Sequence, residues 1–238
     1  MESSCIDSTV QSRVSDMKHQ HGTASSTLSS ASTVVDAEHG VVASMSDLLL
    51  DADEPQIMSL EALEAELVRV LQDFGDSERI RNAKRVLERY SGADWLGFRR
   101  VPDPTSTAVN NYERAPVAKR EGLFDLLLLS WGPNSASPIH SHPCERCYLM
   151  AISGSMFENR YRQEAGGPLT LVHSIPIPTG VATWISDDVG LHSVGNRGET
   201  VSYSLHCYIP GFTTPCVIYK EDGSSVQAVF SECTKTTN

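Results

Sequence analysis

Histidines at three positions could hold a metal ion between them. His140 and His142 are separated by one residue and follow segment 132–138, which is rich in Gly, Pro and Ser. On extended backbone alternate side chains share a face, so both imidazole rings can converge on one point. A third histidine, His192, closely follows Gly190. Three neutral imidazoles suit iron, zinc, copper or nickel and leave coordination positions open, as a catalytic metal requires.

The chain around these histidines has the pattern of an all-β protein. After Gly122, short apolar and β-branched runs are separated by Gly, Pro and Asn, which is typical of strands joined by turns. Their close spacing predicts a β-barrel or jelly roll rather than alternating βαβ units. Strands are expected at 123–131, 147–152, 155–161, 169–175, 181–185 and 200–209.

Two amphipathic helices are expected before the strands. Apolar residues recur at three- and four-residue steps from Leu60 to Leu71, so they share one helical face. A second helix follows Ser77 with the same periodicity and ends near Gly92. Both helices are expected to cover a core with their apolar faces.

The chain is expected to divide into three segments. Residues 1–55 form an extension dense in Ser and Thr and nearly free of aromatics, which predicts disorder because little apolar surface is available for burial. Residues 56–122 are assigned to the N-terminal helices and a connecting segment. Residues 123–238 are assigned to the catalytic barrel.

Composition argues against several functional classes. The 238 residues include 19 basic and 30 acidic side chains, a net charge of −11, and no Lys/Arg-rich run, so neither nucleic acid nor an anionic membrane is an expected partner. No apolar stretch approaches the ~20 residues of a membrane span, and no secretory pattern is visible. The six cysteines are scattered, which favours reduced thiols. A cytoplasmic enzyme is expected.

The histidine motif resembles the first motif of the cupin superfamily, which runs Gly, His-x-His, usually a glutamate ligand, then Gly. Here Cys147 stands at the glutamate position and Gly154 at the final glycine. That replacement is a mark of the eukaryotic cysteine dioxygenases, and the chain resembles this family from about Ile57 to Cys216. The resemblance includes four further motifs: Tyr112-Glu113-Arg114, Leu129-Ser130-Trp131-Gly132, Gly190-Leu191-His192 and Ser204-Leu205-His206-Cys207-Tyr208.

The resemblance implies a mainly β, cupin-type barrel with a short N-terminal helical segment, and a non-haem iron enzyme. It implies that His140, His142 and His192 ligate one Fe(II) per chain. The implied substrates are L-cysteine and O₂ and the implied product is cysteine sulfinic acid, in cysteine catabolism and taurine biosynthesis. The chemistry agrees, because a three-histidine Fe(II) site is net positive and favours an incoming thiolate. A monomer is expected.

The resemblance also assigns roles to five other residues. Cys147 and Tyr208 correspond to a pair that becomes joined as a thioether; alone, Cys147 would be interpreted as a small buried strand residue. His206 resembles the histidine that orients this phenol. Arg114 corresponds to the residue that binds the substrate carboxylate, with Tyr112 beside it. Without the resemblance, Arg114 would be interpreted as a solvated residue of a loop.

Other interpretations of the sequence remain open. A dioxygenase of 3-mercaptopropionate or a related thiol acid would share the three histidines but typically lacks the arginine and the thioether cysteine. An oxidase of N-terminal cysteine on proteins would have no use for Arg114. A non-catalytic cupin that binds a ligand or structural metal is a third alternative. Trp131 is equally a pocket wall or a core aromatic, and Cys144 adds a second thiol near the metal loop that is expected to be inert.

Overall fold

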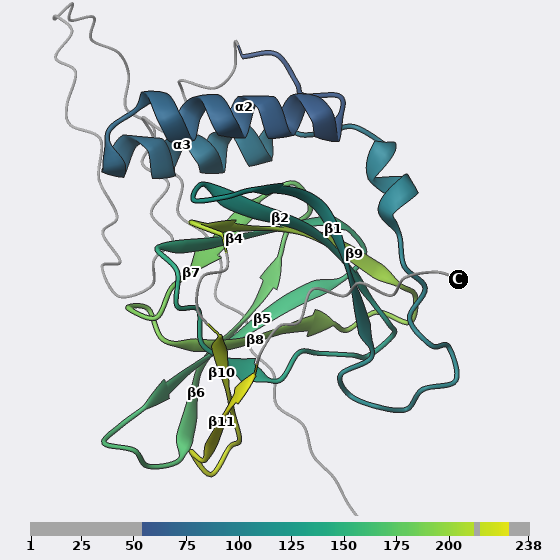
Figure 1. The fold of residues 1–238 in the computed structure, drawn as a ribbon. Coiled ribbons are helices and arrows are strands. Elements are labelled where there is room, and N and C mark those ends of the chain that lie inside the picture. Colours follow the sequence, from purple (N-terminus) through teal and green to yellow (C-terminus); the bar gives the residue numbers. More distant parts are fainter. Residues whose placement is uncertain (1–53, 212–214, 229–238) are drawn as a thin grey trace, which may run out of the picture. The chain divides into compact units, whose positions relative to one another are not determined.

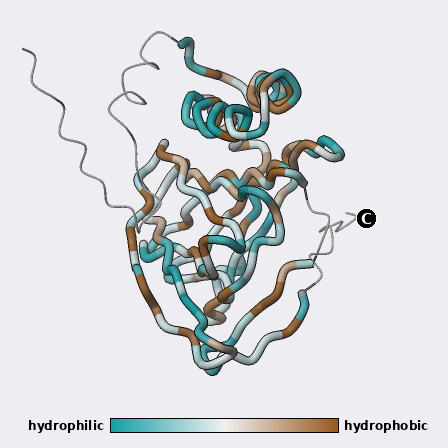
Figure 2. Tube along the Cα trace, turned by 90° about the vertical axis from the view of Figure 1, so that its left-hand side faces the viewer, coloured by the Kyte–Doolittle hydropathy of each residue, from teal (hydrophilic) through white to brown (hydrophobic). Residues whose placement is uncertain are grey.

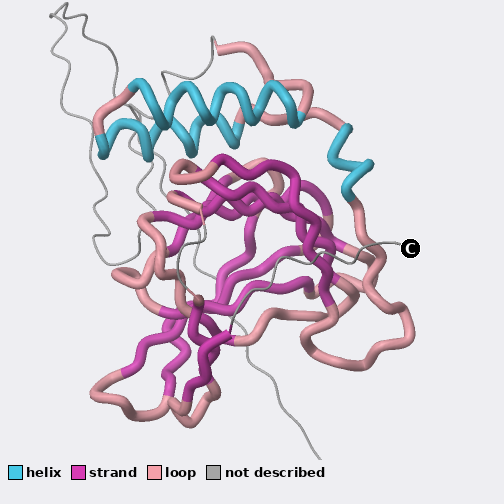
Figure 3. Tube along the Cα trace, viewed as in Figure 1, coloured by secondary structure: helices cyan, strands magenta, loops and turns pink. Residues whose placement is uncertain are grey.

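The computed structural model describes residues 54–211 and 215–228. The predicted disordered extension, residues 1–55, lies outside the described residues except for its last two positions. Strands of two antiparallel sheets outnumber the helices in the described chain (Figure 3), and the predicted mainly β fold with a short helical segment is confirmed.

The two sheets share no strand (Figure 1). The five-stranded sheet has the order β1 (Tyr112–Arg120), β2 (Phe124–Trp131), β9 (Ser202–Ile209), β4 (Arg146–Ser153) and β7 (Ala182–Ile185). The six-stranded sheet has the order β11 (Ser225–Ala228), β10 (Cys216–Tyr219), β3 (Ile139–His140), β8 (Leu191–Asn196), β5 (Met156–Gln163) and β6 (Leu169–Ile177). The six strands expected from the sequence correspond to β2, β4, β5, β6, β7 and β9.

The two predicted helices are present as α2 (Leu60–Asp73) and α3 (Asp76–Glu88), followed by the short 3₁₀ helix η1 (Asp94–Phe98). Ser59 caps α2 by accepting a hydrogen bond from the backbone of Ala62, which satisfies one of the free N–H groups of the first turn. The apolar positions of both helices are buried against the five-stranded sheet, above the strands in Figure 2. No described helix is long and apolar enough to cross a membrane.

The helix pair determines which face of the five-stranded sheet turns inward. On β9, Leu205 and Cys207 belong to the core cluster beneath the helices. Successive strand residues point to opposite faces, so Ser204, His206 and Tyr208 point away from the helices, toward the interior between the sheets. Burying each large apolar side chain under the helices contributes roughly 1.5–3 kcal/mol. A shift of β9 by one residue would lose this burial, so the stability of the fold maintains the register.

The final glycine of the first motif, Gly154, lies in the turn between β4 and β5. Its φ is +93°, and a Cβ atom built there would lie 2.0 Å from Oγ of Ser202. A positive φ is readily adopted by glycine alone, and the close approach excludes any larger side chain.

Strand β1 corrects an expectation about the position of Arg114. Arg114 was expected in a loop, but it lies on β1, whose register places it opposite Leu129 of β2. The sequence of β1 is hard to identify as a strand because it is largely polar and contains Pro116. Proline and charged residues are tolerated on an edge strand, and β1 is the edge of its sheet.

Candidate metal centre

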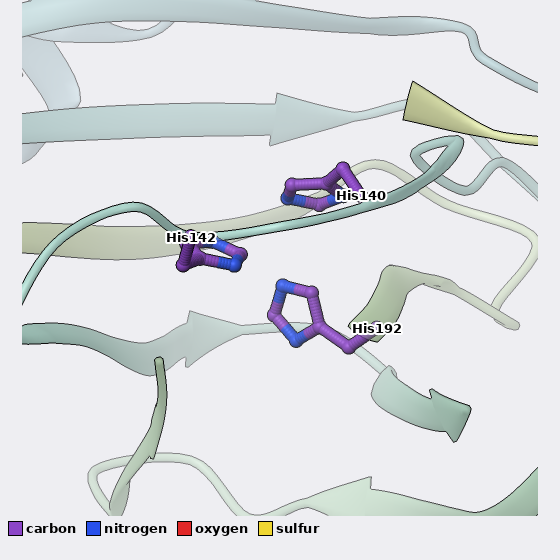
Figure 4. A group of neighbouring side chains, drawn as sticks. All are labelled: His140, His142 and His192. Atoms are coloured by element: carbon purple, nitrogen blue, oxygen red, sulfur yellow. The ribbon is translucent and has the colours of Figure 1, made fainter. Parts of the chain in front are cut away.

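Three buried histidines from two strands and a loop meet in the interior (Figure 4). His140 ends β3, His192 lies opposite it on β8, and His142 follows two residues after β3. One ring nitrogen from each lies within 4.8 Å of the others, and the side chains are only 8%, 3% and 3% exposed for His140, His142 and His192. This spacing could accommodate a single metal ion.

Hydrogen bonds at the far side of two rings leave the facing nitrogens available as ligands. Nδ1 of His140 lies 2.9 Å from the carbonyl oxygen of Pro138, and Nδ1 of His192 lies 2.8 Å from Oε1 of Glu158. A carbonyl or a carboxylate accepts, so each Nδ1 carries the proton and each Nε2 keeps a free lone pair. Nδ1 of His142 has no hydrogen-bond partner within the described chain.

Burial keeps the three rings neutral. It lowers the pKa of His140 to about 4, with a smaller contribution from the charge of Arg114. Burial, then the neighbouring imidazoles, lowers the pKa of His142 and of His192 well below the ordinary histidine value. A metal takes the neutral form of imidazole. The donor set therefore fits a transition-metal ion that accepts nitrogen ligands, including Fe(II).

Cys147 and Tyr208 lie directly across the β4–β9 pairing. With Ile185 they form a small buried cluster, and their side chains are 1% and 6% exposed. The Tyr208 ring lies 6.0 Å from the His142 ring, centroid to centroid, and nearly parallel to it. Burial raises the pKa of both the thiol and the phenol, so both are protonated. The structure thus brings this pair together beside the histidines.

A hydrogen-bonded chain from Trp131 to His206 was missed in the sequence. Nε1 of Trp131 donates to Oγ of Ser204 at 2.8 Å, and that hydroxyl lies 2.9 Å from Nε2 of His206. Indole only donates, so the Ser204 hydroxyl is the acceptor in the first of these bonds and links Trp131 to His206 through the second. Trp131 is therefore more than a pocket wall or a core aromatic. The available signal was the alternation of Ser204, His206 and Tyr208 on one strand face.

Arg114 and Tyr112 lie together at the edge of this interior. Nη2 of Arg114 donates to the Tyr112 hydroxyl at 3.0 Å, and the guanidinium carbon lies 4.9 Å from the centre of that ring. Tyr112 in turn stacks on Trp131 at 4.7 Å between centroids. After burial, the positive charge of Arg114 helps to lower the pKa of His140, so the guanidinium favours the neutral form of that imidazole.

The four cysteines of the described residues form no disulfide: Cys144, Cys147, Cys207 and Cys216. Burial, then the charge of Asp187, raises the pKa of Cys144 to about 12. Its thiol is therefore protonated and a poor nucleophile, although it packs against the cluster of Cys147 and Tyr208.

A family model and several curated relatives carry the description cysteine dioxygenase. The family model described as cysteine dioxygenase type I matches residues 51–222. The chain is 28% identical over 157 residues to cysteine dioxygenase type 1 of Rattus norvegicus, covering 63% of this chain and 76% of that protein. It is 28% identical over 169 residues to the Danio rerio protein of the same name, covering 67% and 80%. Among solved structures, oxalate oxidase in complex with the substrate analogue glycolate aligns with 46% of this chain and 55% of its own, at 16% identity and a TM-score of 0.35.

Proposed function

The chain belongs to the cysteine dioxygenase type I family, and we propose that it converts L-cysteine and O₂ to cysteine sulfinic acid with one ferrous ion per chain. Family membership supports a thiol dioxygenase of the cupin type. The finer proposal names the substrate, the metal and the residues that act on them.

The observation that carries the proposal is the meeting of three neutral, buried imidazoles within 4.8 Å. His140, His142 and His192 would hold the metal, and they supply no negative charge to it. A site of this charge favours an anionic sulfur. Ferrous iron would supply the redox chemistry by which O₂ is added to that sulfur, whereas zinc in the same place has none.

Arg114 is proposed to bind the substrate carboxylate. Its guanidinium presents two parallel N–H groups, which match the two oxygens of a carboxylate. The hydrogen bond and ring contact with Tyr112 hold the guanidinium on β1, so Tyr112 is proposed to orient it. Binding the amino acid at this end would direct its sulfur toward the histidines.

Tyr208 is proposed to act as a hydrogen-bond donor near the reacting atoms, and Cys147 to fix its ring by a thioether. Joining Sγ of Cys147 to a ring carbon of Tyr208 removes one hydrogen from each, and O₂ is the oxidant that accepts them. The cross-strand pairing of the two residues supports this link. His206, held by Ser204, is proposed to orient the phenol.

The test is anaerobic loading of the purified protein with Fe(II), followed by O₂ and L-cysteine. Cysteine sulfinate should form with consumption of one O₂ per thiol, and the zinc-loaded protein should form none. 3-Mercaptopropionate is the competing substrate in a parallel reaction. Faster turnover of 3-mercaptopropionate would make that thiol acid the substrate instead of cysteine. If neither thiol supports oxygen uptake, the protein would be a metal-binding cupin without this activity.

A further inference from the structure

Glu158 is a fully buried carboxylate in contact with a proposed metal ligand. Its side chain is 1% exposed, and its Oε1 lies 2.8 Å from Nδ1 of His192, which is 3% exposed. The two residues come from neighbouring strands, β5 and β8. Burying a carboxylate is costly unless it is paired and hydrogen-bonded. An apolar side chain would fill this interior at lower cost, so the buried acid indicates a role beyond packing.

Arg160 holds the other oxygen of this carboxylate. It lies two residues along β5, on the same face, and its Nη2 is 3.2 Å from Oε2 of Glu158. The same Nη2 donates to the carbonyl of Trp184 on β7 at 2.9 Å. The ion pair is not aligned as a hydrogen bond, since Oε2 accepts none from the described residues. The guanidinium thus links the two sheets and places a positive charge beside Glu158.

The three proposed ligands differ in what supports their outer nitrogen. Nδ1 of His140 lies against a neutral carbonyl, that of His142 has no partner in the described chain, and that of His192 lies against a carboxylate. A carboxylate makes the stronger, charge-assisted hydrogen bond. Support of a metal-binding histidine by a carboxylate fixes the tautomer and the ring angle and strengthens the ligand.

We propose that Glu158 is a positioning residue for the metal, which accepts the Nδ1 proton of His192 so that Nε2 faces the ion, and that Arg160 holds Glu158 in place. This inference rests on the proposed function, since it requires the three histidines to hold the metal.

The test is the dissociation constant of Co(II) and of anaerobic Fe(II), measured by competition with a chromophoric chelator. Glu158→Gln keeps the size of the side chain but loses the charge, and it should weaken metal binding by about 10- to 100-fold. Arg160→Met should weaken binding less. The matched control is Glu88→Gln, because Glu88 of α3 is likewise paired with a basic side chain, Lys84, and accepts from the backbone N–H of Ala182, but contacts no proposed ligand. It should leave the dissociation constant unchanged.

A purely structural role is excluded by two further measurements. In the His192→Ala background, Glu158→Gln should cause no additional loss of metal affinity, because the supported ligand is gone. Denaturant unfolding of the metal-free proteins separates stability from affinity. If Glu158→Gln and Arg160→Met bind metal as tightly as the wild type, or if the loss persists without His192, the inference is overturned while the proposed function stands. A wild-type protein that binds neither metal overturns both.

Discussion

His140 and His192 face each other as direct register partners on the antiparallel strands β3 and β8. Two of the three proposed ligands are therefore neighbours in one sheet, although they are 52 positions apart in the sequence. A one-residue slip of either strand would turn its imidazole to the opposite face. The metal centre thus depends on strand register as much as on the presence of histidine.

Replacing His142 by Ala should abolish retention of iron and with it activity. The variant keeps only two of the three imidazoles, and the substrate thiolate has no complete site to bind. Metal content after desalting and cysteine-dependent oxygen uptake measure the two effects. His173→Ala on β6, which is partly exposed, is the control and should keep both. A metal-free His142→Ala protein with full activity would rule out the metal centre proposed here.

Arg114→Ala should raise KM for cysteine far more than for cysteamine, which lacks the carboxylate. A charged hydrogen bond contributes about 1.5–3 kcal/mol, so kcat/KM for cysteine should fall by roughly 10- to 100-fold. Steady-state oxygen uptake with both thiols measures the difference. Lys119→Ala, on the same strand but exposed, should change neither substrate. An equal loss for cysteine and cysteamine would remove Arg114 from carboxylate binding.

Cys147→Ser should prevent formation of the thioether with Tyr208. Wild-type protein that has turned over should be lighter by two hydrogens, and digestion should yield one linked peptide containing both residues. Cys207→Ser is the control, because Cys207 belongs to the core beneath the helices rather than to the cluster of Tyr208; its link should form. Intact and peptide mass spectrometry decide, and unlinked peptides after many turnovers would count against the cross-link.

Ser204→Ala should reduce both stability and turnover. It leaves the buried Nε1–H of Trp131 without its acceptor, which costs about 1–3 kcal/mol of unfolding free energy. It also frees His206, so kcat should fall while KM for cysteine changes little. Ser193→Ala, which alters a buried serine of β8, is the control for turnover. Unchanged kcat in Ser204→Ala would show that the hydrogen bonds linking Trp131, Ser204 and His206 contribute to stability alone.

The metal-free protein should lose stability as the pH falls below about 6.5, the ordinary pKa of histidine. Burial lowers the pKa of folded His140 to about 4, so between these values the unfolded chain binds the extra proton. Stability therefore rises with pH across this window, by at most about 1.4 kcal/mol per unit for one histidine. Urea unfolding between pH 7 and 5 measures the slope. His140→Gln should reduce this slope without abolishing it, because burial also lowers the pKa of His142 and of His192. An unchanged slope in His140→Gln would contradict the prediction.

The sequence by itself determined the local structure and the residue types of the site. The apolar periodicity from Leu60 to Leu71 predicts α2, because burial of one face is a local property of spacing. Short β-type runs likewise predict six of the strands. The spacing of His140 and His142 and the distant His192 indicate a metal site, and the match to family motifs selects Arg114, Cys147 and Tyr208.

Tertiary structure alone decided which side chains meet across strands. The pairing of Cys147 with Tyr208 and the contact of His192 with Glu158 depend on register between strands that are distant in sequence. Nothing in the local pattern of Glu158 distinguishes it from an exposed acid, since its burial results from packing between two sheets. The same holds for the polar edge strand that carries Arg114. Side-chain alternation is encoded locally, but strand pairing results from the free energy of the whole fold.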